Sequence, residues 1–244
     1  MQLLVSLRAA DEVAAALAGG ADIIDAKEPE RGSLGPVAPE VLRSISARVP
    51  GTMPLSVALG DFTAAEAIRD AVAATSPPPR GAPVYLKLGF AGERSSSAMR
   101  GLVTAALEAA ALAPARPIVV PVAYADWMEA GSPPPEDVLA SAVLTGARAF
   151  LLDTYTKDGK GLLDRLQLGR VQALAARGRA AGLLVALAGS LDLAALDRIA
   201  GLADVVGIRG AACLGGRSGR LDAGMVRKFR GRMESVRGAL STAG

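Results

Sequence analysis

The sequence predicts a single-domain α/β protein, a (β/α)8 TIM barrel that spans residues 1–244. Short apolar runs alternate with longer helical patterns along the whole chain, and each pair takes about thirty residues. The short runs are apolar nearly throughout, as expected for parallel strands that are buried on both faces. A length of 244 residues is also typical of one such barrel.

The alternation predicts eight strands and eight helices. The strands are expected at residues 3–7, 23–27, 55–59, 84–88, 118–123, 149–153, 184–188 and 204–208. The helices are expected at residues 11–18, 39–48, 63–74, 98–112, 136–145, 168–181, 191–200 and 222–237. Two proline-rich segments, 76–79 and 131–135, are interpreted as surface loops because the repeat continues through both. Neither a dinucleotide-binding nor a P-loop glycine signature follows the first strand, which favours a closed barrel over an open sheet.

Composition narrows the classes of function. Hydrophobic residues make up 51% of the chain and charged residues 21%, which indicates a folded protein with a large core. The apolar runs are too short to span a membrane and the first residues lack a signal-peptide pattern, so we expect a cytoplasmic protein. A lone Cys213 excludes an internal disulfide. Without histidine, metal sites and triads built on that residue are excluded, and acid–base chemistry falls to other side chains.

The charge balance favours a small anionic substrate as the partner. A formal net charge of +3 is weak evidence for nucleic-acid binding, and an aromatic content of 3% offers little surface for base stacking. We therefore expect neither a nucleic-acid nor a membrane partner. The alanine-rich helices suit packing on the barrel and packing between subunits equally well. The sequence therefore leaves a homo-oligomer as one possibility for the oligomeric state.

Lysine is scarce, and its positions are informative. The chain has 22 arginines and 5 lysines, and arginine neither forms a Schiff base nor readily loses its proton. Four lysines fall at the carboxyl ends of expected strands or in the loops that follow, where barrel active sites lie: Lys27, Lys87, Lys157 and Lys160. Asp25 points to the same side of its strand as Lys27, and Asp153 ends the sixth strand. We predict a catalytic set of Lys27, Lys87, Asp25, Asp153 and Lys157, with a purely structural ring of ion pairs as the alternative.

Glycine-rich turns follow the seventh and eighth strands, where these barrels commonly bind phosphate. Glycine lets backbone N–H groups approach an anion closely, and a helix N-terminus attracts it. The alternative is a pair of tight turns that simply require glycine. The predicted phosphate-binding residues are Gly189, Ser190, Arg209, Gly210, Gly215 and Gly216.

Several blocks of this sequence resemble the (5-formylfuran-3-yl)methyl phosphate synthases. They run from the first strand to the last helix and comprise Gly19-Gly20-Ala21-Asp22-Ile23-Ile24-Asp25-Ala26-Lys27, Gly32-Ser33-Leu34-Gly35, Leu152-Asp153-Thr154, Lys157-Asp158-Gly159-Lys160, Ala186-Leu187-Ala188-Gly189-Ser190 and Val206-Gly207-Ile208-Arg209-Gly210-Ala211-Ala212-Cys213. The middle loops resemble the family least. Residues 28–31, directly after Lys27, are more charged than the resemblance leads us to expect.

The resemblance implies a barrel synthase that condenses two molecules of glyceraldehyde 3-phosphate, a triose phosphate, into a furan aldehyde phosphate. That product is a precursor of methanofuran-type one-carbon carriers. The resemblance further implies that Lys27 is the Schiff-base lysine and Lys87 the proton acceptor, and that Asp153 and Lys157 belong to active-site motifs. This chemistry requires no metal and no other cofactor. Two alternatives stay open: a class I aldolase-type lyase acting on another sugar phosphate, and a non-catalytic barrel that binds a phosphorylated metabolite.

Overall fold

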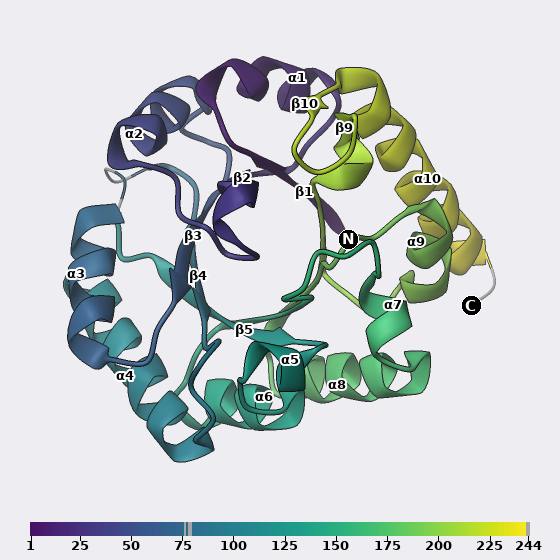
Figure 1. Cartoon of the computed structure of the whole chain (residues 1–244). Coiled ribbons are helices and arrows are strands. Elements are labelled where there is room, and N and C mark those ends of the chain that lie inside the picture. Colours follow the sequence, from purple (N-terminus) through teal and green to yellow (C-terminus); the bar gives the residue numbers. More distant parts are fainter. Residues whose placement is uncertain (76, 78–79, 243–244) are drawn as a thin grey trace.

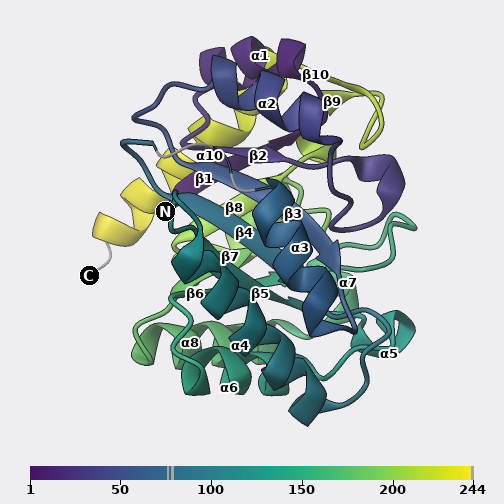
Figure 2. The same cartoon turned by 90° about the vertical axis from the view of Figure 1, so that its left-hand side faces the viewer.

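Eight parallel strands close into a barrel in the order β1 to β8, as a computed structural model of residues 1–75, 77 and 80–242 shows. Helices surround the barrel on the outside (Figures 1 and 2). The predicted TIM-barrel fold is therefore confirmed. The barrel strands are β1 Gln2–Leu7, β2 Ile23–Ala26, β3 Leu55–Asp61, β4 Val84–Gly89, β5 Ile118–Tyr124, β6 Ala149–Asp153, β7 Leu184–Leu187 and β8 Val205–Ile208.

The helices follow the strands along the chain and cover the outside of the barrel. They are α1 Val13–Ala18, α2 Pro39–Arg48, α3 Ala65–Thr75, α4 Ser96–Leu112, α5 Trp127–Ala130, α6 Pro135–Leu144, α7 Leu162–Arg165, α8 Leu168–Ala180, α9 Leu193–Ile199 and α10 Ala223–Thr242. Three short 3-10 turns accompany them: η1 Ala10–Glu12, η2 Pro29–Arg31 and η3 Gly210–Ala212. None of the helices within the described ranges is long and apolar enough to cross a membrane.

The structure adds short elements that the periodicity of the sequence does not reveal. Helices α5 and α7 have four residues each, and β9 Cys213–Leu214 pairs with β10 Arg220–Leu221 in a small antiparallel hairpin. Such pieces are shorter than the windows over which apolar periodicity is visible. The expected proline-rich loop at 76–79 falls, apart from Pro77, outside the described residues.

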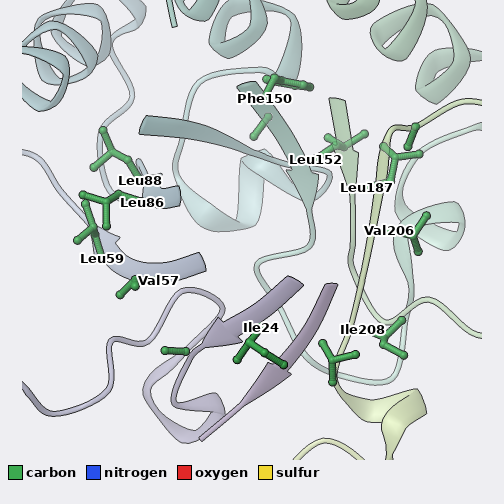
Figure 3. Packing of buried hydrophobic residues seen from close by; sticks show 14 of the residues in the cluster. Ile24, Val57, Leu59, Leu86, Leu88, Phe150, Leu152, Leu187, Val206 and Ile208 are labelled. Atoms are coloured by element: carbon green, nitrogen blue, oxygen red, sulfur yellow. The ribbon is translucent and has the colours of Figure 1, made fainter. Parts of the chain in front are cut away.

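Alternate residues of each strand face two different surroundings. One set, drawn in part in Figure 3, packs outward against the helices and includes Ile24, Val57 and Leu86. The other set faces the barrel interior and includes Ile23, Val120 and Leu151. Because side chains in a strand alternate with a period of two, Ile23, Asp25 and Lys27 all face inward. This alternation brings charged side chains of β2 into the upper part of the barrel.

The segment between β2 and α2 forms a roof over part of the barrel mouth (Figure 1). Leu34 in this segment is buried in the interior cluster together with Tyr124 of β5. The Ser33 hydroxyl donates a hydrogen bond to the carbonyl of Thr154 at 2.7 Å, across the barrel. Gly89 of β4 has no room for a side chain, since a Cβ there would collide with Asp61, Tyr124 and Leu34. The roof therefore covers the β3–β5 side of the mouth.

Candidate active site

Lys27 lies directly after β2 and lines the main cavity of the barrel. Its backbone N–H donates to the carbonyl of Leu7 at 3.0 Å, which continues the strand pairing and fixes the side chain toward the interior. Only 7% of the residue is exposed. Burial lowers the pKa of Lys27 to about 7, because the attraction of Asp153 and Asp25 does not offset burial and the repulsion of neighbouring lysines. A large share of this amine is neutral at physiological pH.

Lys87 and Asp25 form a buried ion pair beside Lys27. The Lys87 Nζ atom lies 2.7 Å from both carboxylate oxygens of Asp25. The Ser6 hydroxyl donates a third contact to Asp25 Oδ2 at 2.6 Å. Burial raises the pKa of Asp25, yet the attraction of Lys87 and Lys27 outweighs it, so the net shift is downward. Asp25 is therefore a carboxylate that holds Lys87 in one orientation.

Asp153 and Lys157 form a second pair on the opposite side of Lys27. Lys157 Nζ lies 3.1 Å from Asp153 Oδ1 and also donates to the carbonyl and the hydroxyl of Thr154. Burial raises the pKa of Asp153, but Lys157 and Lys27 reverse that shift and bring it to about 2. The pKa of Lys157 is lowered by its own burial, against the attraction of Asp153. Lys157, paired with Asp153, thus lines the same cavity as Lys27.

The structure brings together the five residues that were predicted as catalytic. Lys27, Lys87, Asp153 and Lys157 line one cavity, and Asp25 lies buried behind Lys87. The cavity encloses about 880 Å³, including the open solvent at its mouth. Lys160, the fourth lysine near the strand ends, is exposed and does not line the cavity. The catalytic roles themselves stay predictions.

Gly189 and Ser190 in the loop after β7 and Gly210 after β8 are among the residues that line the cavity. Gly189 has φ of 99° and Ser190 of 49°, both in the left-handed region. A Cβ on Gly189 would lie 3.0 Å from the backbone nitrogen of Thr154, so only glycine fits without a shift. This close turn directs backbone atoms of the β7 loop toward the cavity.

The expectation for Gly215 and Gly216 is corrected by their position. Both are exposed in the turn between β9 and β10, and neither lines the cavity. Each has φ of 79°, so glycine is needed there for the chain reversal. The structure supports the tight-turn alternative for these two residues.

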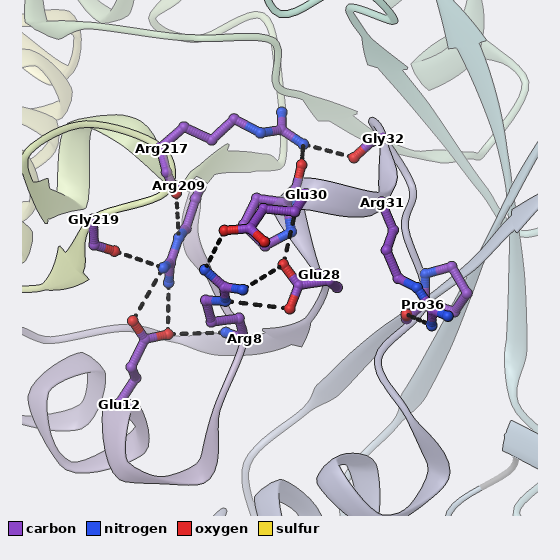
Figure 4. Close-up of polar contacts among 11 residues, drawn as sticks. Arg8, Glu12, Glu28, Glu30, Arg31, Gly32, Pro36, Arg209, Arg217 and Gly219 are labelled. Carbon is purple, nitrogen blue, oxygen red and sulfur yellow. Dashed lines mark hydrogen bonds and ion pairs between the residues drawn. The ribbon is translucent and has the colours of Figure 1, made fainter.

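Arg209 also lines the cavity, but its N–H donors are engaged within the protein. Two of its N–H groups donate to the carboxylate of Glu12, at 2.6 and 3.0 Å. The remaining donors reach the backbone carbonyls of Ser6, Arg217 and Gly219, and Figure 4 shows the last two of these contacts. A guanidinium has five N–H donors, and all are used here, so Arg209 joins the end of β1 to the β8 loop. Glu12 belongs to no motif that the sequence analysis recognised, and its structural role becomes visible only through its buried ion pair with Arg209.

Arg217 is the guanidinium that sequence reasoning passed over. It lies in the turn of the β9–β10 hairpin and lines the cavity. One terminal nitrogen donates to the carbonyls of Pro29 and Gly32, which ties the hairpin to the roof segment (Figure 4). Burial lowers its pKa, against the attraction of Asp153. Its position within a glycine-rich turn after the last barrel strand is the signal that could have singled it out.

The unexpectedly charged segment 28–31 has a structural explanation. Arg8, after β1, makes ion pairs with Glu28 at 3.1 Å and with Glu30 at 2.9 Å. Glu28 also accepts a hydrogen bond from the backbone N–H of Glu30 and so caps η2. These contacts anchor the roof segment to the end of β1, and none of them involves Lys27.

Taken together, the fold and this centre define an α/β-barrel protein with a lysine–aspartate site at the carboxyl ends of its strands. The chain belongs to the 4-HFC-P synthase family, whose model matches residues 3–230. It is 35% identical over 96% of its length to the whole (5-formylfuran-3-yl)methyl phosphate synthase of Methanothermobacter thermautotrophicus. It is 37% identical over its full length to 98% of a putative synthase of the same name from Streptomyces griseus subsp. griseus.

Solved structures share the fold at much lower sequence identity. A crystal structure of KGPDC from Streptococcus mutans has a TM-score of 0.63 and 18% identity, and the match covers 96% of this chain and 98% of that one. A 3-hexulose-6-phosphate synthase has a TM-score of 0.55 and 17% identity, with 94% and 99% covered. These similarities concern the barrel alone.

Competitive labelling should detect the lowered pKa of Lys27. Below pH 7 its protonated form dominates, and above pH 7 the reactive neutral amine dominates. We expect acetylation of Lys27 by acetic anhydride, followed by mass spectrometry, to rise through a midpoint near pH 7. A free lysine side chain of pKa about 10.4, added as an internal reference, gives the ordinary response. A midpoint for Lys27 near that of the reference would contradict the effect of burial.

Replacing Arg209 tests whether it is structural. Arg209→Ala leaves Glu12 buried without its partner, which should lower the free energy of unfolding by about 3–5 kcal/mol in urea titrations. Arg232→Ala is the matched control, because its ion pair with Asp197 is half exposed and is worth roughly 0–1 kcal/mol. An unchanged free energy of unfolding in Arg209→Ala would contradict the structural role and favour Arg209 as a substrate contact.

Proposed function

We propose that this protein is a lyase-type synthase that condenses two molecules of glyceraldehyde 3-phosphate to (5-formylfuran-3-yl)methyl phosphate. The observation that carries the proposal is Lys27, a buried amine with a pKa of about 7 between two lysine–aspartate pairs. The product is the one for which the similar proteins are named. A furan of this kind serves as a precursor of methanofuran-type one-carbon carriers, which is the role we infer for a cytoplasmic enzyme of this class.

Lys27 is the nucleophile in this proposal. Its neutral Nζ adds to the carbonyl carbon of the triose phosphate, and loss of water leaves an iminium ion. The iminium makes the neighbouring C–H acidic, which permits elimination and carbon–carbon bond formation near neutral pH. Two trioses bring six carbons and two phosphates, and the product keeps six carbons and one phosphate. One phosphate and two waters therefore leave.

The two ion pairs divide the proton transfers between them. Lys87 accepts the proton from the carbon next to the iminium as a neutral amine, after the proton that it carries in the ion pair with Asp25 has passed to solvent or to a departing hydroxyl. Asp25 stabilises the positive charge that Lys87 then carries. Lys157, whose pKa is lowered by burial, is placed to donate a proton to a departing hydroxyl or phosphate. Asp153 orients Lys157 and balances its charge.

The phosphate of the retained triose lies at the β7 and β8 loops. Gly189, Ser190 and Gly210 offer a close approach of the backbone, and Arg217 offers the charge. Arg217 takes the place that the sequence suggested for Arg209, whose donors are all used within the protein. A phosphate dianion is a stronger acceptor than the two carbonyls that Arg217 now contacts.

Two variants separate the nucleophile from the proton acceptor. Lys27→Arg keeps a positive charge but forms no iminium, so borohydride trapping of triose phosphate and turnover should both disappear. Lys87→Arg should still be trapped on Lys27, while furan formation falls by roughly 10²–10⁴-fold. Mass spectrometry locates the trapped lysine, and near-ultraviolet absorbance reports the furan aldehyde, which an ordinary aldol product lacks. Turnover by Lys27→Arg would exclude the Schiff-base mechanism.

Arg217→Ala tests the phosphate site. Loss of a charge-assisted contact of roughly 1.5–3 kcal/mol should raise the KM for triose phosphate by about 10- to 150-fold. Arg220→Ala is a suitable control because Arg220 is exposed on the adjacent strand β10 and does not line the cavity. Equal KM values for the two variants would show that the phosphate does not bind at Arg217 and must bind elsewhere in the cavity.

A further inference from the structure

The cavity continues below Lys27 into the interior of the barrel. Its lining includes Ile23, which lies four residues before Lys27 on the inward face of β2, and Val205 at the start of β8. Barrel interiors are normally filled by bulky branched side chains. Here several inward positions carry small residues, and we call the space that they leave the bore: Ser6, Ser56, Ala186 and Gly207.

Ser56 gives the bore a polar contact without a partner. It is 1% exposed, and its hydroxyl has no hydrogen-bond partner among the described residues. Ser6 and Ser56 both lie in register with Asp25, on the two strands beside it, and the Ser6 hydroxyl donates to Asp25 Oδ2 whereas the Ser56 hydroxyl does not. Buried hydroxyl groups are rarely left unpaired, so a group that fills the bore is expected to accept a hydrogen bond from Ser56.

The walls of the bore select an uncharged ligand. Leu4, Ile23, Val120 and Leu151 are apolar, and Lys87, which lines the same cavity, is already paired with Asp25. A phosphate dianion would lose its hydration there without a free cation in exchange. A flat, uncharged ring that carries a carbonyl or ether oxygen matches both the apolar walls and the unpaired hydroxyl of Ser56.

We propose that the bore binds the phosphate-free furan end of the product and of the six-carbon intermediates that precede it. This inference rests on the proposed function. With the ring in the bore and the phosphate beside Arg217, one molecule spans the cavity past Lys27. The three-carbon unit that loses its phosphate thus occupies the part of the site that offers no phosphate contact.

Furan-2-carboxaldehyde, an uncharged analogue of the ring, tests the bore apart from turnover. Borohydride should trap it on Lys27 of the full-length protein, and the half-saturating concentration is the quantity to compare. Ala186→Val places two methyl groups in the bore and should raise this concentration at least tenfold. Gly207→Ala, whose Cβ would lie 3.3 Å from Ala188 and 3.5 Å from Leu4, is a milder filling variant with the same direction of effect.

Ser56→Ala and a matched control test the hydrogen bond. Ser56→Ala should raise the half-saturating concentration of the furan aldehyde by about 2- to 10-fold. Ser132→Ala removes another buried hydroxyl, outside the cavity, and should leave the half-saturating concentration of the furan aldehyde unchanged. Trapping of glyceraldehyde 3-phosphate on Lys27 should change less than threefold in the variants of Ser56, Ala186 and Gly207.

The outcomes separate this inference from the proposed function. Failure of the unmodified protein to trap furan-2-carboxaldehyde, or equal trapping in all variants, would overturn the bore as a binding site. Parallel loss of triose phosphate trapping would overturn it too, since the substitutions would then act through Lys27. Trapping of the furan aldehyde that depends on the bore, without conversion of triose phosphate, would retain the site and reject the proposed reaction.

Discussion

The site depends on a shortage of negative charge around three buried lysines. Lys27, Lys87 and Lys157 enter the upper part of the barrel, where water is largely excluded, and Asp25 and Asp153 are the carboxylates that balance them. Each carboxylate pairs closely with one lysine. Lys27 receives attraction from both at longer range but holds neither, so its burial goes uncompensated and its pKa falls. Two firm ion pairs thus produce one reactive amine.

The loops around this centre are joined by arginines rather than by apolar packing alone. Arg209 fixes the β8 loop to Glu12, and Arg8 fixes the roof segment to the end of β1. Arg217 closes the remaining side by contacting carbonyls of the roof from the β9–β10 hairpin. Arg209 and Arg217 both line the cavity, but the hydrogen bonds of Arg209 use all of its nitrogens, whereas those of Arg217 to the roof come from one nitrogen.

The barrel interior shows how a common fold is adapted by residue size. Inward positions with serine, alanine or glycine leave the bore open beneath Lys27, while larger residues such as Ile23 and Leu151 form its walls. The roof has the opposite character, because Leu34 and Tyr124 fill the β3–β5 side completely. The glycine-rich loops after β7 and β8 contribute Gly189, Ser190 and Gly210 to the lining of the cavity.

The alternation of apolar strands and helices was enough to predict the barrel, because buried parallel strands have a recognisable pattern and a closed sheet suits eight of them. The same logic gathers Lys27, Lys87, Asp153 and Lys157, since the carboxyl ends of all barrel strands meet at one mouth. Residue spacing also placed Asp25 on the face of Lys27. The local sequence does not show which of these charged side chains pair with one another. The pairing of Lys87 with Asp25 depends on the register of strands 62 positions apart in the chain.

The same reason accounts for the corrections on the phosphate side. A glycine-rich turn looks alike in sequence whether it faces a cavity, as Gly189 does, or solvent, as Gly215 and Gly216 do. An arginine at a strand end is available or fully used according to what lies across the fold, and for Arg209 that is Glu12, 197 positions away. Sequence therefore determined which kinds of residue meet at the barrel mouth. Tertiary packing alone decided which of them keep a free hydrogen-bonding group, because that depends on contacts between distant segments.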